Sequence, residues 1–207
     1  MNSNEINRLI RKRPGFCANS AETRSTRDFF TARTAVKNYD HHVERHVVLV
    51  APEIHWNTGN IGRTCLAAGA VLHLIKPLGF SLESREVKRA GLDYWENVKP
   101  AVWDSFDDFL ANKAPQHDEV AVFSKRGSKS FWTMNCPERL FLIFGSETRG
   151  LPDSILGKFS DATYHIPITS EIRSLNLSTA AGIALYESLR AAKSFHGRSS
   201  DSGSVEP

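Results

Sequence analysis

The sequence has few cysteines and no long hydrophobic run, and each shortage excludes a class of protein. Its three cysteines, Cys17, Cys65 and Cys136, are far apart and odd in number, which argues against a disulfide framework or a cysteine-based metal site. The longest apolar runs, such as Val47–Ala51 and Leu140–Phe144, are far shorter than the roughly 20 residues of a membrane span. No apolar stretch of a secretory signal is visible. We therefore expect no membrane partner and a reducing compartment, the cytoplasm.

Common enzyme fingerprints are missing as well. The chain contains neither G-x-G-x-x-G nor G-x-x-x-x-G-K-[ST], and no G-x-S-x-G nucleophile elbow. Its eight histidines include no Cys/His set with metal-ligand spacing, so we expect no metal. A plain Rossmann-like enzyme for small molecules is therefore the least favoured reading.

What is present is a basic arm in front of an otherwise balanced chain. The 207 residues are 41% hydrophobic and 24% charged, which suits one globular domain with tails. Residues 1–45 carry nine Lys and Arg against five Asp and Glu, although the whole chain has a net charge of only +3. Such an arm suits contacts with nucleic-acid phosphates. An organelle-targeting segment is the alternative, against which Glu5, Glu22 and Asp28 argue.

Between residues 46 and 195, short apolar runs alternate with helical segments. The predicted strands are nearly continuous in apolar residues and cover 46–51, 71–75, 120–124, 140–145 and 163–168. The predicted helices cover 57–68, 84–90, 105–112 and 176–192. This alternation predicts an α/β domain with a mostly parallel sheet flanked by helices, which binds ligands at the carboxyl ends of its strands. We expect the arm 1–45 and the Ser/Gly-rich tail 196–207 to be flexible.

The first of three unusual segments follows the first predicted strand. It reads NTGNIGR, from Asn57 to Arg63, and its two amide side chains are suited to phosphate or ribose. Arg63 lies three residues after Asn60, so both share one face of the predicted helix. An ordinary strand–helix turn with an exposed arginine is the alternative.

The second and third segments follow later strands. FGSETRGLP, at 144–152, has two glycines and a proline that shape a tight loop, whose backbone groups suit an adenine edge. The alternative is a plain loop in which Glu147 and Arg149 are solvated. IPITSEIRSLNLS, at 166–178, leads into the last helix, where Asn176 as a simple helix cap is the alternative. That helix N-terminus also favours anionic groups.

In this order, the three segments resemble the SPOUT methyltransferases of the SpoU branch, over residues 46–193. PLGF at 77–80 and RAGLDYW at 89–95 are similar to the TrmL-type tRNA (cytidine/uridine-2′-O-) methyltransferases. The resemblance implies methyl transfer from S-adenosylmethionine to the 2′-oxygen of a tRNA wobble nucleotide. It also implies a homodimer and a deep C-terminal trefoil knot, which pattern reasoning alone never suggests.

The resemblance further assigns site residues. The residues that match the family's cofactor pocket are Phe123, Gly145, Ile166 and Ser174. The catalytic set is Arg63 with three residues that orient it or the nucleotide, namely Asn57, Glu147 and Asn176. Because an arginine stays charged at neutral pH, we expect Arg63 to stabilise the developing alkoxide and the adjacent phosphate, with Glu147 as its charge partner.

RNA contacts are predicted from basic residues near aromatic ones. Spacing of i, i+3 and i+4 puts Arg85, Lys88 and Arg89 on one helix face, and Tyr94 and Trp95 follow closely. The alternative is a solvated helix with the two rings packed in the core or a dimer interface. The remaining predicted RNA contacts are Arg149 and Arg173.

Two other functions stay open at this point. The same chemistry on another tRNA position or on rRNA is the nearest alternative. A knotted RNA-binding dimer without catalysis is the other, but it would not need the Arg63, Glu147 and Asn176 that this chain retains.

Overall fold

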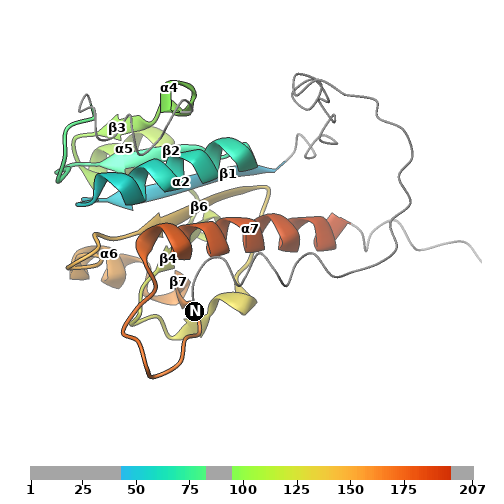
Figure 1. Cartoon of the computed structure of the whole chain (residues 1–207). Helices are drawn as coiled ribbons and strands as arrows, with labels where there is room; N and C mark the ends of the chain where they lie inside the picture. The colour runs from blue at the N-terminus through green and yellow to red at the C-terminus, as the bar shows by residue number, and fades with distance from the viewer. Residues whose placement is uncertain (1–42, 83–94, 197–207) are drawn as a thin grey trace, which may run out of the picture. The chain divides into compact units, whose positions relative to one another are not determined.

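A seven-stranded sheet forms the centre of the structure, a computed structural model that describes residues 43–82 and 95–196 (Figure 1). In chain order, the strands are β1 (Glu44–Val50), β2 (Val71–Ile75), β3 (Ala101–Trp103), β4 (Val120–Phe123), β5 (Lys129–Ser130), β6 (Arg139–Phe144) and β7 (Thr163–His165). Their order in the sheet is β3-β2-β1-β6-β4-β7-β5, and the neighbours pair in parallel. The predicted α/β class with a parallel sheet is therefore confirmed.

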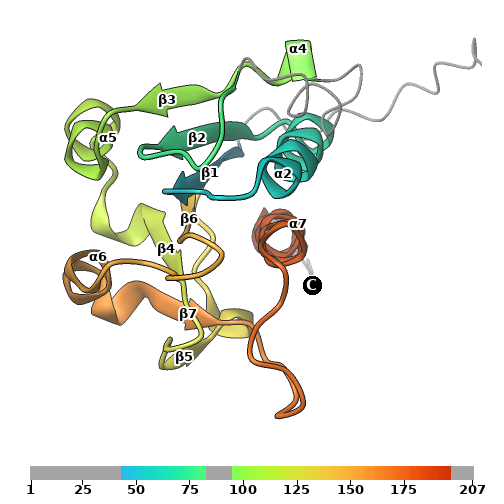
Figure 2. The ribbon, with the colours of Figure 1, turned by 60° about the vertical axis from the view of Figure 1, so that its left-hand side comes forward.

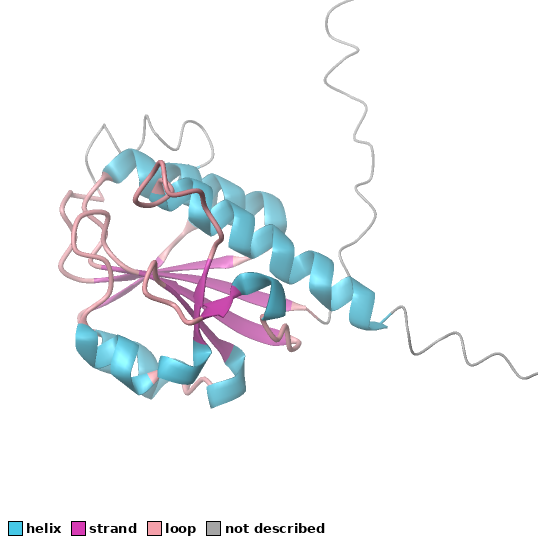
Figure 3. Cartoon of the chain, turned by 90° about the horizontal axis from the view of Figure 1, so that it is seen from below, coloured by secondary structure: helices cyan, strands magenta, loops and turns pink. Residues whose placement is uncertain are grey.

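Helices cover both faces of this sheet. Figure 2 shows one pair on each side, and Figure 3 shows the same three layers from below. One face carries α2 (His55–Ala68) and α7 (Leu177–His196), and the other carries α5 (Phe106–Lys113) and α6 (Asp153–Lys158). The remaining helices are the short α4 (Trp95–Val98) and the 3-10 turns η2 (His117–Glu119), η3 (Phe131–Thr133) and η4 (Ser160–Ala162). No helix in the described part of the chain is long and apolar enough to cross a membrane.

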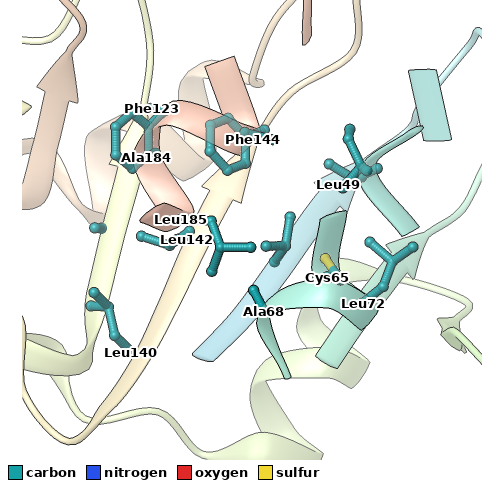
Figure 4. Packing of buried hydrophobic residues seen from close by; sticks show 14 of the residues in the cluster. Leu49, Cys65, Ala68, Leu72, Phe123, Leu140, Leu142, Phe144, Ala184 and Leu185 are labelled. Atoms are coloured by element: carbon teal, nitrogen blue, oxygen red, sulfur yellow. The ribbon is translucent and has the colours of Figure 1, made fainter. Parts of the chain in front are cut away.

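The two covered faces explain why the strands are continuously apolar. Successive side chains of a strand point to opposite faces, so a strand buried on both sides has no polar alternation. Val47 and Leu49 belong to the cluster under α2 and α7, whereas Val48 and Val50 belong to the cluster under α5 and α6. Figure 4 shows part of the first cluster, in which Leu49 and other strand residues pack with residues of both helices.

Most predicted elements are present, with shifted ends. The strand at 71–75 is confirmed as predicted, and the last helix begins one residue after Asn176. The predicted helix start at Asn57 is wrong, because α2 begins at His55. The predicted strand at 163–168 ends already at His165. The short elements β3, β5 and α6 were not predicted, since a few residues are too short for a recognisable period.

Some predictions lie outside the described residues. These are the flexible arm up to residue 42, the helix at 84–90 and the tail from 197. Strand β1 begins at Glu44, two residues before the predicted start, although Glu44 and Arg45 are charged. Both residues continue the parallel ladder, opposite Arg139 and Leu140 of β6. Backbone pairing therefore extends the strand beyond its apolar run.

Arg45 links three distant parts of the domain. Its side chain is only 1% exposed. Its Nη1 donates to the carbonyls of Pro137 (2.9 Å) and Glu138 (2.8 Å). Its Nε donates to Ser188 Oγ (3.1 Å) and its Nη2 to the Ser188 carbonyl (3.2 Å). Burial lowers the pKa of the guanidinium, and these neutral acceptors replace the lost water. The start of β1, the segment before β6 and helix α7 are thus held by one side chain.

A second buried polar chain runs from Glu44 to Trp103. Trp103 Nε1 donates to His73 Nδ1 (3.1 Å), and His73 Nε2 lies 2.9 Å from His46 Nδ1. His46 Nε2 in turn lies 2.9 Å from the Glu44 carboxylate. An indole N–H can only donate and a carboxylate can only accept, so each histidine is neutral and protonated on Nε2. All hydrogen bonds of this chain therefore donate in the same direction, from Trp103 towards Glu44.

This histidine chain predicts a pH dependence of stability. Burial, with His46 and Lys113 nearby, lowers the pKa of His73 to about 3, and burial also lowers the pKa of His46. The unfolded chain takes up these protons below about pH 6.5, whereas the folded protein does not. The free energy of unfolding should therefore be highest above pH 6.5 and fall by about 1–2 kcal/mol between pH 6.5 and 5 from His73 alone.

Urea unfolding at a series of pH values measures this dependence. His73→Phe should flatten it, because one histidine that stays neutral in the folded state is removed. The control is Trp132→Phe at an exposed position, which removes no titrating group and should keep the slope of the wild type. A wild-type stability that does not change between pH 6.5 and 5 would contradict the prediction.

Candidate functional site

Two segments that follow neighbouring strands bind each other at the carboxyl edge of the sheet. Helix α2 begins after Ile54, which has no side-chain cap of its own. The Glu147 carboxylate, from the loop after β6, accepts the backbone N–H groups of Glu53 (2.8 Å) and Ile54 (3.2 Å). In return, the Glu53 carboxylate accepts Thr148 Oγ1 (2.7 Å) and Thr148 N (3.2 Å). A carboxylate at a helix N-terminus is favourable, so Glu147 caps α2 from a distant part of the chain.

A polar relay then connects all three motif segments. Asn57 is buried, and its Nδ2 donates to Glu147 Oε1 (2.9 Å). Asn176 Nδ2 donates to Asn57 Oδ1 (3.0 Å), and Asn176 Oδ1 accepts Ser178 N (2.8 Å) at the start of α7. The carboxylate accepts at one end and a backbone N–H donates at the other, so both amide orientations are determined. The structure thus brings together Asn57, Glu147 and Asn176, as the motifs predicted.

The loop after β6 closes on itself. Ser146 and Gly150 exchange two backbone hydrogen bonds (3.2 and 2.9 Å), and Gly150 has a φ of +71°. A side chain on Gly145 would collide with the backbone of Gly150 and Leu151. The predicted tight loop is confirmed, and Gly145 is needed for its closure. A contact of Gly145 with the cofactor stays a prediction.

Three of the four predicted cofactor residues follow or end adjacent strands. Phe123 ends β4, Gly145 follows β6 and Ile166 follows β7, and β4 lies between the other two strands. Phe123 is buried, with its ring stacked on Phe144 at a centroid distance of 4.9 Å. Ile166 is half-buried and packs against the core, whereas Ser174 is exposed. The arrangement offers apolar surface and backbone groups and no charged side chain.

Arg63 is exposed on α2, about 9 Å along the helix axis from Asn57 and a third of a turn around it. Glu147 finds its partners at the first turn of α2, so its pairing with Arg63 stays a prediction.

The predicted RNA contacts are only partly described. Arg149 and Arg173 are exposed. The cluster Arg85, Lys88 and Arg89 lies outside the described residues. Trp95 is buried, and its ring leaves just enough room for Gly62 of α2, because an added Cβ there would lie 3.1 Å from the ring. Core packing, the alternative reading, is therefore confirmed for Trp95.

Glu53 and Thr148 complete the contact between the two segments, and neither was predicted as a site residue. A signal for Glu53 was available, because it is a charged residue directly after a buried strand. Thr148 carried no such signal, since its partner lies 95 residues away.

The family model that matches this chain is the SpoU rRNA Methylase family, over residues 44–186. The chain belongs to the SpoU methylase family. The match includes both strands that carry the first and second motif segments and ends within α7. The predicted resemblance to the SpoU branch is thereby confirmed.

Two relatives are similar to this chain over nearly their full length. The tRNA (cytidine(34)-2′-O)-methyltransferase of Burkholderia ambifaria is 43% identical over 148 residues, which are 71% of this chain and 95% of the relative. A homologue from Geobacillus stearothermophilus is 47% identical over 155 residues, or 74% of this chain and 98% of the homologue.

Solved structures of RNA methyltransferases are also similar to this chain. One that concerns the 2-OH methylation of C/U34 on tRNA is 45% identical, with a TM-score of 0.67, and covers 73% of this chain and 98% of that one. An AdoMet-bound rRNA methyltransferase from Sinorhizobium meliloti is 28% identical, with a TM-score of 0.63, and covers 72% of this chain and 56% of that one.

Proposed function

We propose that this SpoU-family protein is a tRNA 2′-O-ribose methyltransferase that methylates the wobble cytidine or uridine with S-adenosylmethionine. The relay from Glu147 through Asn57 to Asn176 carries the proposal, because it assembles all three motif segments at one edge of the sheet. Relatives that bear this activity name, and a solved structure concerned with C/U34 of tRNA, support the choice of substrate.

The residues at the ends of β4, β6 and β7 suit the cofactor. Adenine and ribose are uncharged, and Phe123, Gly145 and Ile166 offer apolar surface and backbone groups. Ser174, which is exposed on the following segment, adds a hydroxyl. When bound, S-adenosylmethionine supplies a methyl group that its sulfonium already activates. The protein then has to hold the 2′-oxygen in line with that methyl, and alignment alone is worth about 7–11 kcal/mol.

Arg63 and the relay have different tasks in this proposal. Arg63 is the cation that stabilises the developing alkoxide and fixes the adjacent phosphate. Asn57, Glu147 and Asn176 are positioning residues, because they satisfy one another and the ends of two helices. They hold α2, and with it Arg63, against the loop that precedes α6.

The finer features of the family belong to the same proposal. We infer a C-terminal trefoil knot, since the segment after β7 returns to Asn57 of the first motif before α7 begins. We also infer a homodimer, because α2 and α7 expose Leu66, Ile183 and Tyr186, which a second copy would cover. We also propose a cytoplasmic location, with an organelle as the alternative if the basic arm is a targeting segment.

Mapping of 2′-O-methyl groups tests the function. Total tRNA from cells that lack the enzyme is incubated with the pure protein and S-adenosylmethionine. We expect new methyl groups at nucleotide 34 of a subset of tRNAs. Methylation only at another tRNA position or on rRNA would favour the nearest alternative. RNA and cofactor binding without any methylation would favour the non-catalytic dimer.

A further inference from the structure

Trp56 is a large apolar side chain at the edge of the site. It is 59% exposed, although the next residue, Asn57, is buried in the relay. Single exposed aromatic side chains are common on protein surfaces, so exposure alone assigns no role. Its position on α2 and its neighbours are more informative.

Trp56 shares one face of α2 with two polar residues of the first motif. Asn60 and Arg63 follow it at i+4 and i+7, and all three are exposed. At 100° per residue, they lie within about 60° of one another around the helix. This stripe offers an aromatic ring, an amide and a guanidinium within about 10 Å along the helix axis. Those groups match the base, the ribose and the phosphate of a nucleotide.

Neighbouring rings support the Trp56 side chain. The His55 ring lies 4.2 Å from it, tilted by 51°, and Phe80 meets His55 edge-on at 6.4 Å. The loop that carries Phe80 is docked on the segment before α2, since Gly79 N donates to the Pro52 carbonyl (2.9 Å). A Cβ on Gly79 would lie 2.7 Å from the backbone of that segment, so the two pieces of backbone are in direct contact. The exposed ring of Trp56 is therefore supported by packed neighbours on a well-connected backbone.

We propose that Trp56 stacks on an unpaired RNA base, either of the methylated nucleotide or of an adjacent one. This inference rests on the proposed function and adds a determinant of specificity to it. Proteins recognise single-stranded RNA by splaying bases out onto aromatic side chains, whereas a paired base inside a helix offers no free face. Trp56 thus selects a nucleotide in a loop over the same nucleotide in a duplex.

Substitution of Trp56 measures the effect on RNA. Trp56→Ala should weaken binding of an anticodon stem-loop by about 5- to 150-fold, the usual loss for one stacked base. Trp56→Phe keeps a ring and should recover most of this loss. Both variants should bind S-adenosylmethionine and sediment as the wild type does. Trp132→Ala, at a tryptophan that is 64% exposed on η3, is the matched control and should bind RNA as the wild type does.

A double-mutant cycle that combines Trp56→Ala with abasic RNA tests whether a base stacks on the ring. Each nucleotide of the anticodon loop is replaced in turn by an abasic ribose, and binding by the wild type and by Trp56→Ala is compared. At the stacked position, or at nucleotide 34 and its neighbours if the stack is shared, the two proteins should bind equally tightly. At all other positions, the variant should keep its defect.

Three outcomes would overturn the proposal. Equal affinity of Trp56→Ala and the wild type for intact RNA removes any role in binding. A defect of the same size at every abasic position shows that no base stacks on the ring. A changed sedimentation of Trp56→Ala shows that the residue lies between copies of the chain. Methylation of the intact anticodon stem-loop by the wild type is measured separately and reports on the proposed function, so the two hypotheses can fail independently.

Discussion

Arg63→Ala should lower the rate of methyl transfer by about 10²- to 10³-fold while leaving the affinity for S-adenosylmethionine unchanged. An electrostatic donor aimed at a developing oxyanion is worth roughly 2.7–4 kcal/mol, which corresponds to this loss. The two effects should separate because Arg63 is exposed on α2, whereas the predicted cofactor residues lie at the ends of β4, β6 and β7. Single-turnover methylation of tRNA and calorimetry with the cofactor measure them.

Two further variants sharpen this experiment. Arg63→Lys keeps the charge but loses the planar guanidinium, so it should recover only part of the rate. Lys158→Ala removes an exposed cation from α6, on the opposite face of the sheet, and should be as active as the wild type. A near wild-type rate for Arg63→Ala would show that Arg63 has a structural role and no catalytic one. Loss of cofactor binding in that variant would place Arg63 in the cofactor pocket and refute the separation.

Arg45→Ala should lower the free energy of unfolding by about 1–3 kcal/mol, the usual cost of leaving a buried polar group without its partner. The substitution removes the Arg45 donor from the carbonyls of Pro137, Glu138 and Ser188 and from Ser188 Oγ, although the Glu138 carbonyl keeps the N–H of Glu44. It also removes the connection from β1 to α7. Chemical denaturation gives the difference from the wild type.

Arg190→Ala is the matched control for this loss. Arg190 is exposed on α7 and pairs with Glu187 at i−3, and exposed pairs of this kind contribute less than about 1 kcal/mol. If Arg45→Ala costs no more than Arg190→Ala, the buried hydrogen bonds of Arg45 do not stabilise the folded protein. In that case, packing of the strand and not its first charged residues holds α7 in place.

Much of the secondary structure could be predicted, because its signals are local. The run at 71–75 is a strand as predicted, and the helix predicted at 105–112 is observed as α5, with Ser105 as its N-cap. Ser105 Oγ accepts the backbone N–H of Asp108 at 3.0 Å, a contact between residues three apart. Elements shorter than one period, such as β5, gave no such signal.

The first motif shows where local signals mislead. Residues 57–60 were expected at the very start of the helix, yet Asn57 lies inside α2 and belongs to the relay. The cap comes instead from Glu147, 93 residues after Ile54. A polar residue at a helix start has the same sequence pattern in both cases, so only the position of its partner distinguishes them.

The α/β class, most strands and helices, and the three segments that form the site follow from local sequence signals, because apolar runs and turn residues act over a few neighbours. The order of the strands, the place of Arg45 in β1 and the hydrogen bond between Asn57 and Asn176, 119 residues apart, depend on the folded chain. Such contacts depend on which distant surfaces bury each other's apolar area and satisfy each other's polar groups. Local periodicity contains no information about that choice. The three motif segments form one site because the sheet places the ends of the strands that precede them at one edge.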